Sequence, residues 1–377
     1  PFTGSFMRRY VTFEEGAYFD LDALLAMQRA LSSSDYFRLV QVEPLRDGAD
    51  SLRVPIRVEL DMQARNSFTI GAGYGTDTGV RGTVSGRRRW LNPYGHRLEG
   101  ELRASLRAQR FQGQYVIPLH TGPSNRIAFS TALQRDAFEG LESRRIHARA
   151  ELDHMRGAWR EVASVRLVEE WYRDGDQERS STLLIPELAW SRLWGDDVIF
   201  PRRGLRLQLD LAGASEAVLS DVAFAQATVR LGVARGLWPS GRILLRGNAG
   251  TTFVDDFLTL PVSLRLYAGG DQSVRGFGYR SIGPVGPDGS VIGGRHRLVG
   301  SLELEQMVFA GFGFAVFTDA GNVFATRSGV TLSDLEHGAG AGLRWRSPIG
   351  LVRADIAWPV SRPEPEPRLH FVVGGVL

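Results

Sequence analysis

The chain has 377 residues, of which 44 are Gly and 20 Phe, and no Cys, a composition that suits many short strands and turns better than packed helices. All 45 basic residues are Arg, and they are interleaved with 42 acidic residues to leave a net charge of +3. This balance argues against nucleic acid as a partner, because a nucleic-acid-binding chain would carry a basic stripe. The longest uncharged apolar stretch, Gln306 to Thr318, is too short for a membrane-spanning helix, which needs about 20 residues.

Residues 1–64 have the pattern of a small α+β module. Asp20 is a favourable N-cap for a helix in which Phe19 can pack on Leu24. Beyond the helix the period of apolar residues changes to two, and a turn at Asp47-Gly48 separates two predicted strands, the second from Leu52 to Met62. The predicted apolar face of the helix consists of Leu21, Leu24, Leu25, Gln28 and Leu31.

From residue 65 to residue 377, polar and apolar residues alternate. In Arg97 to Ala108, polar residues occupy one face and Leu, Ala and Gly the other, which predicts a strand with one wet and one apolar side. Roughly sixteen such segments have about the ten residues that a tilted strand needs to cross a bilayer. Alternation would also fit a soluble sandwich, but sixteen strands are too many for one twisted open sheet. We therefore predict an all-β transmembrane barrel of about 16 antiparallel strands.

A long connection, about residues 252–296, interrupts this alternation and has the densest Gly and Pro content. It contains GGDQSVRGFGYRSIGP, from Gly269 to Pro284, which resembles the loop motif of the Omp85 superfamily, built around Val-Arg-Gly-Phe/Tyr. Within that superfamily, the Gly-Gly-Asp opening and the short outer loops resemble the TamA branch. Other segments that resemble the family are Tyr36-Phe37 with Val40 and Val42, Gly73 to Gly79, Trp90 to His96, Ser301 to Glu303, Thr318 to Gly321 and Arg344 to Gly350.

The resemblance implies a partial POTRA domain in residues 1–64, on the periplasmic side, before a barrel in residues 65–377 whose long loop folds inward. The motif residues are Val274, Arg275, Gly276 and Phe277. The family pattern further implies that Arg275 pairs with Glu303 and Asp319 inside the barrel, and the guanidinium fork suits such carboxylates. By the alternation of strand residues, both acids fall on polar, non-lipid faces. The alternative is a loop Arg that meets only solvent or lipid phosphate.

The resemblance also implies that the first barrel strand, near 66–75, and the last, near 369–377, pair weakly and can open as a lateral seam. Gly supports this physically because it weakens strands and permits bending. Alternatively, these glycines serve only the curvature of the wall. The seam residues that we single out are Gly71, Gly73, Gly75, Phe371, Gly374 and Gly375.

In function, the resemblance implies a non-enzymatic factor in the bacterial outer membrane that inserts or translocates other proteins. The implied partners are outer-membrane proteins or autotransporters as substrates, a TamB-like partner anchored in the inner membrane, and outer-membrane lipids including lipopolysaccharide. A BamA-like core insertase, a two-partner-secretion pore and a porin are the alternatives. The seven His lack metal-ligand spacing and no Gly-x-Ser-x-Gly elbow occurs, so we expect no catalytic residues, metal or cofactor.

Overall fold

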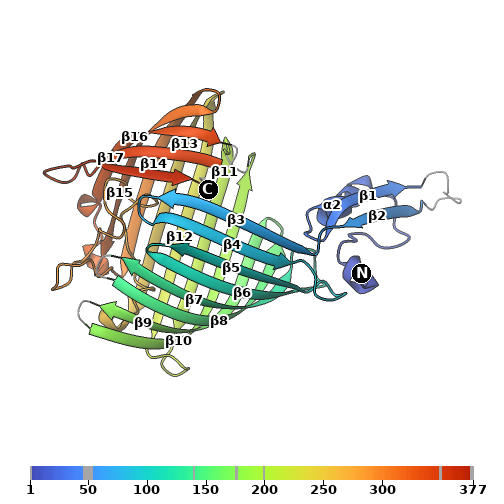
Figure 1. Cartoon of the computed structure of the whole chain (residues 1–377), viewed down its shortest axis with the longest axis horizontal. Coiled ribbons are helices and arrows are strands. Elements are labelled where there is room, and N and C mark those ends of the chain that lie inside the picture. The colour runs from blue at the N-terminus through green and yellow to red at the C-terminus, as the bar shows by residue number, and fades with distance from the viewer. Residues whose placement is uncertain are drawn as a thin grey trace.

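The computed structural model describes residues 2–45, 54–138, 141–174, 177–197, 200–347 and 350–373. In these residues it shows a small N-terminal module and a closed β-barrel, which lie end to end (Figure 1). The predicted turn at Asp47-Gly48 and the seam residues Gly374 and Gly375 lie outside the described residues. No helix in the described ranges is long and apolar enough to cross a membrane.

The module contains α1 (Gly4–Arg8), α2 (Leu21–Ser32) and the antiparallel pair β1 (Phe37–Pro44) and β2 (Ile56–Met62). The predicted helix and its N-cap are confirmed: the Asp20 carboxylate accepts hydrogen bonds from the backbone N–H groups of Asp22 and Ala23. The predicted apolar face is only partly right, because Leu21 and Leu25 are exposed. The buried face is instead formed by Leu24, Met27 and Leu31, which pack with Phe6, Tyr10, Tyr36 and Phe37.

Sixteen antiparallel strands, counted over the described residues, close the barrel and confirm the predicted all-β class. Each strand pairs with its neighbours in the chain, and β18 returns to pair with β3. The strands are β3 (Asn66–Gly75), β4 (Gly79–Arg88), β5 (Arg97–Ser105), β6 (Ala108–Pro118), β7 (Arg126–Phe138), β8 (Leu141–Arg156), β9 (Trp159–Asp174), β10 (Gln177–Gly195), β11 (Arg203–Ala214), β12 (Phe224–Trp238), β13 (Gly241–Val254), β14 (His296–Phe309), β15 (Phe312–Phe324), β16 (Glu336–Ser347), β17 (Gly350–Trp358) and β18 (Arg368–Val373).

One predicted strand is wrong in extent. The alternating segment from Arg97 to Ala108 does not form a single strand, because β5 ends at Ser105 and β6 begins at Ala108. Ser105 closes the turn: its hydroxyl accepts a hydrogen bond from the Ala108 N–H and donates to the Ala108 carbonyl. A two-residue hairpin preserves the alternation on both sides, so periodicity alone does not detect it.

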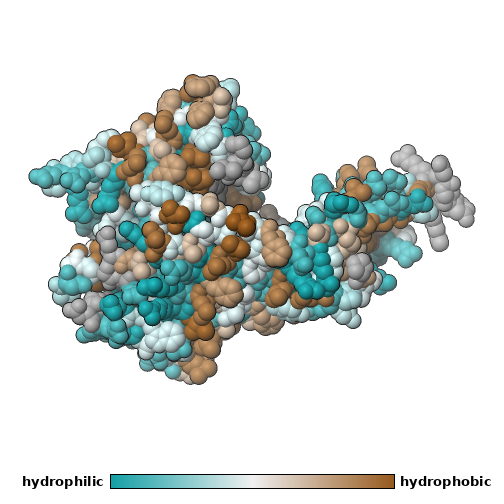
Figure 2. Space-filling view, in the orientation of Figure 1, coloured by the Kyte–Doolittle hydropathy of each residue, from teal (hydrophilic) through white to brown (hydrophobic). Residues whose placement is uncertain are grey.

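The barrel wall is polar inside and apolar outside, the reverse of a soluble protein. On β14, Ser301, Glu303 and Glu305 are buried on the lumen side, while Gly300 and Leu302, which alternate with them, are exposed. Figure 2 shows apolar residues on the outer wall and hydrophilic residues at the loop end, away from the module. This distribution is what a bilayer requires of a barrel, since each outward residue faces hydrocarbon.

The connection between β13 and β14, residues 255–295, fills part of the lumen. It begins with a short 3₁₀ turn, Phe257–Thr259, and continues without a regular strand. Bridges within it pair Leu266 with Gly294 and Ala268 with Ile282. Its apolar side chains pack on the inner faces of β14 and β15 in a cluster of Leu266, Ala268, Val274, Phe277, Ile282, Val299 and Val323. Two further 3₁₀ turns, Arg327–Gly329 and Leu332–Asp334, lie between β15 and β16.

Candidate functional site in the barrel lumen

Arg275 of the loop lies at the centre of a buried ion-pair network, with 1% of its surface exposed. Its Nε and Nη2 donate to the two carboxylate oxygens of Asp319, over 2.7 and 2.9 Å, in the bidentate geometry that fits a guanidinium to a carboxylate. Its Nη1 donates to Glu303 over 2.8 Å and to Asp355 over 3.1 Å. The structure thus brings together Arg275, Glu303 and Asp319, and adds Asp355. The guanidinium carbon also lies 3.3 Å from the ring centroid of Phe317.

A second arginine, Arg344 on β16, joins the same carboxylates from the barrel wall. It is fully buried and donates to Glu303 over 2.6 Å, to Glu305 over 2.8 Å and to Asp355 over 2.5 Å. Arg242 on β13 extends the network, because its Nε donates to Glu305 over 2.6 Å. Strands β13 to β17 therefore share one continuous set of buried charges with the loop.

Sequence reasoning missed Arg344, Arg242 and Asp355. The signal for Asp355 was present, since polar Arg353 and Asp355 alternate with apolar residues in Leu351 to Trp358 and so share the lumen face. Alternation does not indicate which strands bring their lumen-facing charges close to one another around the loop. Burying these charges singly would be costly, and their mutual contacts offset that cost only in a fixed geometry. The network therefore holds the loop in one position.

The other motif residues hold the backbone beside Arg275. Val274 is fully buried and Phe277 nearly so, both in the cluster under β14 and β15. Gly276 has a φ of +92°, and a Cβ there would lie 2.8 Å from the backbone carbon of Trp358. No residue with a side chain fits that position without displacing the connection between β17 and β18.

The seam between β3 and β18 is the thinnest junction of the barrel in the described residues. Six residues of β18 pair with β17, whereas a single pair in the described residues, Val372 with Gly75, joins β18 to β3. Two side chains add contacts across the seam: Thr76 Oγ1 accepts from the Phe371 N–H over 2.8 Å, and Arg81 donates to the Val373 carbonyl over 3.1 Å.

The register also settles which way the seam residues face. Gly75 lies opposite Val372, which pairs with the buried, lumen-facing Arg353. By alternation Gly71, Gly73 and Gly75 line the lumen, while Phe68 and Ile70, 80% and 82% exposed, point outward. Phe371 lies beside Tyr74, with their ring centroids 6.0 Å apart.

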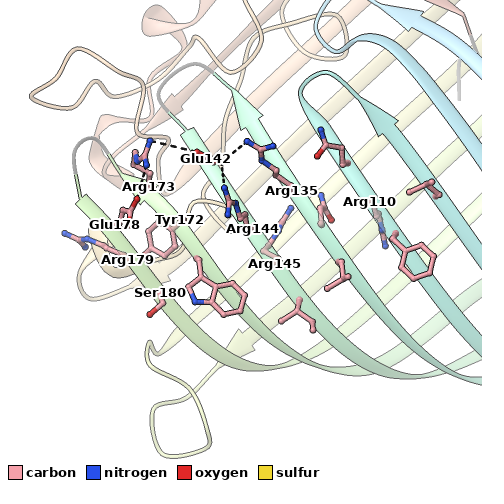
Figure 3. A pocket seen from close by; sticks show the side chains of 17 residues that line it. Arg110, Arg135, Glu142, Arg144, Arg145, Tyr172, Arg173, Glu178, Arg179 and Ser180 are labelled. Carbon is pink, nitrogen blue, oxygen red and sulfur yellow. Dashed lines mark hydrogen bonds and ion pairs between the residues drawn. The ribbon is translucent and has the colours of Figure 1, made fainter.

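A separate hollow of about 840 Å³ lies at the loop end of β5 to β10 (Figure 3). There Arg135, Arg144 and Arg173 all contact Glu142, over 3.0, 3.3 and 4.0 Å (Figure 3). All three arginines are about half exposed or more, so these ion pairs contribute little stability. In the described part of the chain, no group of three or more His, Cys, Asp or Glu is arranged to hold a metal ion.

Comparison with known proteins identifies the kind of barrel. A family model described as the Omp85 superfamily domain matches residues 51–376. The outer membrane protein assembly factor BamA of Nitratidesulfovibrio vulgaris is 22% identical over 376 residues, which cover 93% of this chain and 46% of that protein. The chain thus spans about half the length of this curated relative.

Solved structures show the same fold at low identity. BamA from Haemophilus ducreyi lacking POTRA domains 1–3 superposes with a TM-score of 0.83 at 18% identity, covering 99% of this chain and 82% of that one. CdiB from Acinetobacter baumannii gives 0.60 at 15% identity, covering 99% and 71%, and CdiB from Escherichia coli gives 0.63 at 12%, covering 99% and 74%.

Proposed function

Because the chain belongs to the Omp85 superfamily, we propose that it inserts or translocates other proteins at the outer membrane through the seam between β3 and β18. The family itself points to the outer membrane of Gram-negative bacteria. The single observation that carries the proposal is the thin seam, where one residue pair in the described residues takes the place of a full ladder. An edge freed there would offer unpaired backbone groups onto which a substrate strand can add.

The more specific role of the protein within the superfamily is also part of this proposal. Two finer roles would both use such a seam. One is a TamA-like factor that works with a TamB-like inner-membrane partner on autotransporters, and the other is a BamA-like core insertase. The similarity to BamA in sequence and fold makes the BamA-like role at least as well supported. In either role the protein acts on substrate polypeptides by strand pairing and catalyses no covalent reaction.

We assign residues 1–64 to a partial POTRA domain in the periplasm, with residues 65–377 as the barrel. The module's α2, β1 and β2 support this, as does the coverage of 99% of this chain by a structure of BamA lacking POTRA domains 1–3. The exposed guanidiniums of Arg135, Arg144 and Arg173 suit phosphates of outer-membrane lipid or lipopolysaccharide. Glu142, Glu169 and Glu178 share that surface. Phosphate binding there would therefore depend on the placement of the guanidiniums and not on a net positive charge.

The experiment that tests the function locks the seam. Val373 lies opposite Tyr74 in the register that pairs Val372 with Gly75, so Tyr74→Cys with Val373→Cys places two thiols across it. We expect oxidation to stop substrate assembly and reduction to restore it, with the barrel folded throughout. The matched control is Val84→Cys with Leu102→Cys, an outward pair within the β4–β5 ladder, which should leave assembly unchanged. Normal assembly by the locked seam would contradict the proposal.

A secretion pore is the second candidate, and the lumen distinguishes it. The buried network occupies the side of the lumen next to β13–β17, and the loop also reaches β9, where Ser263 donates to Glu170, which favours a plugged barrel over an open one. Conductance recordings in planar bilayers should therefore show a mostly closed channel. A steadily open channel would favour the pore instead.

A further inference from the structure

The loop contacts both edges of the seam as well as the ion-pair network. On the last strand, His370 of β18 is 2% exposed, and its Nε2 accepts a hydrogen bond from the Gly276 N–H over 3.1 Å. The other ring nitrogen of His370 has no hydrogen-bond partner within the described residues. The contact with the loop is therefore the hydrogen bond that orients this ring.

On the first strand, the contact is made by the turn that joins β3 to β4. Asp77 in that turn is 8% exposed, and its Oδ2 accepts from the Asp271 N–H over 2.8 Å. Gly270 permits the approach, because it has a φ of +102° and a Cβ there would lie 2.5 Å from Asp77 Oδ2. Arg107 holds the turn from the other side by donating to the Asp77 carbonyl over 3.1 Å.

The two contacts lie five residues apart in the loop, on either side of Ser273 and Val274 and next to Arg275. Arg275 is fixed to β14, β15 and β17 through Glu303, Asp319 and Asp355. The loop therefore connects the wall formed by β14, β15 and β17 to both seam edges, whereas in the part of the chain described the edges share one backbone pair and two side-chain hydrogen bonds. Losing a buried hydrogen bond to the loop removes an interaction comparable with those that join the edges themselves.

We infer that His370 and Asp77 are positioning residues that hold the last and the first barrel strand on the loop, so that loop release and seam opening are one coupled event. This rests on the proposed role of the seam. It adds a specific mechanical link: a substrate or partner that displaces residues 270–276 frees both edges together, and neither edge moves far while the loop stays in place.

The test reads the seam and the loop without any substrate. Tyr74→Cys and Val373→Cys are combined with changes at His370 or Asp77. Two quantities are measured: the initial rate of seam disulfide formation and the rate of protease cleavage within 255–295. His370→Ala and Asp77→Ala should each lower the initial crosslinking rate by about tenfold and raise loop cleavage, since each leaves a buried N–H unpaired. His370→Gln and Asp77→Asn keep an acceptor near the same place and should restore both readouts.

The control is His120→Ala, an exposed histidine in the β6–β7 turn, which should change neither readout. Heat-modifiable mobility on gels reports that each variant barrel is folded. If His370→Ala and Asp77→Ala crosslink at the parental rate with a protected loop, the coupling is wrong. If they loosen seam and loop while assembly continues with the seam locked, the coupling stands and the proposed function fails.

Discussion

At the scale of single residues, Arg275 is the side chain that links the long loop to the barrel wall. It pairs with three carboxylates from three strands, and its backbone N–H also donates to Asp319 over 3.0 Å. Removing Arg275 would leave the negative charges of Glu303, Asp319 and Asp355 close together with less positive charge to neutralise them. The Arg344 guanidinium would still neutralise part of that charge through Glu303 and Asp355. The cost therefore falls mainly on the loop, and the barrel ladder is unaffected.

We predict that Arg275→Ala destabilises the loop by about 3–5 kcal/mol, the usual cost of removing one partner of a buried ion pair. Residues 255–295 should become sensitive to protease, assembly activity should fall, and the barrel should keep its heat-modifiable mobility. Arg275→Lys should be intermediate, because it keeps the charge and loses the fork. The control is Arg103→Ala, whose side chain is 57% exposed in its pair with Glu101. Unchanged loop protection in Arg275→Ala would mean that the network does not hold the loop.

At the scale of elements, the module is joined to the barrel rim by side-chain hydrogen bonds that no sequence pattern predicts. Tyr36, immediately before β1, donates from its hydroxyl to the Gly95 carbonyl over 2.6 Å. Arg9 donates to the carbonyls of Gly122 and Pro123, over 2.9 and 2.7 Å. These bonds connect the module to the β4–β5 and β6–β7 turns and fix where it sits against the barrel.

Burial raises the pKa of Tyr36 to about 12. A phenol whose folded pKa lies above its unfolded value of about 10 stabilises the folded junction below pH 10 and loses that contribution as pH rises through 12. We predict that proteolysis between module and barrel increases over this window. Tyr36→Phe should cost about 1 kcal/mol at neutral pH and weaken the dependence. Burial also raises the pKa of Tyr10, so a residual dependence should persist. An identical pH profile in Tyr36→Phe would contradict this assignment.

The sequence predicted elements well and contacts between distant elements poorly, for physical reasons. Alternation of period two defines each strand and the face of Glu303 or Asp319, because neighbouring residues must face water and lipid in turn. It cannot detect a two-residue turn such as Leu106-Arg107, since the pattern continues through it. Nor can it identify Arg344 as a partner of Glu303, 41 residues away, because that contact reaches across β15 and depends on the register of three strands.

At the scale of the whole molecule, the barrel has two unlike halves. The buried ion pairs of the loop lie on the side formed by β13 to β17, next to the seam, while the loop also reaches the opposite wall through Ser263, which donates to Glu170, and Tyr279, which lies against Phe138. On the side formed by β5 to β8, lumen residues such as Arg103 and Arg145 pair locally with acids, and Arg103 remains largely exposed. The half with the buried ion pairs thus borders the thin seam. The seam edges therefore lie beside strands that these ion pairs hold together.

The last prediction concerns the orientation of this molecule in its membrane. The module and the short connections, such as those at 157–158 and 239–240, lie at one end of the barrel, while the longer 215–223 and 359–367 connections lie at the other. If the module is periplasmic, Glu216 and Glu364, both exposed, face outward from the cell. Since the chain has no Cys, single cysteines can be introduced without background. A membrane-impermeant maleimide should label Glu216→Cys and Glu364→Cys in intact cells, and Glu15→Cys of the module only after the outer membrane is opened. Labelling of Glu15→Cys from outside would reverse the topology, and with it the side from which substrates reach the seam.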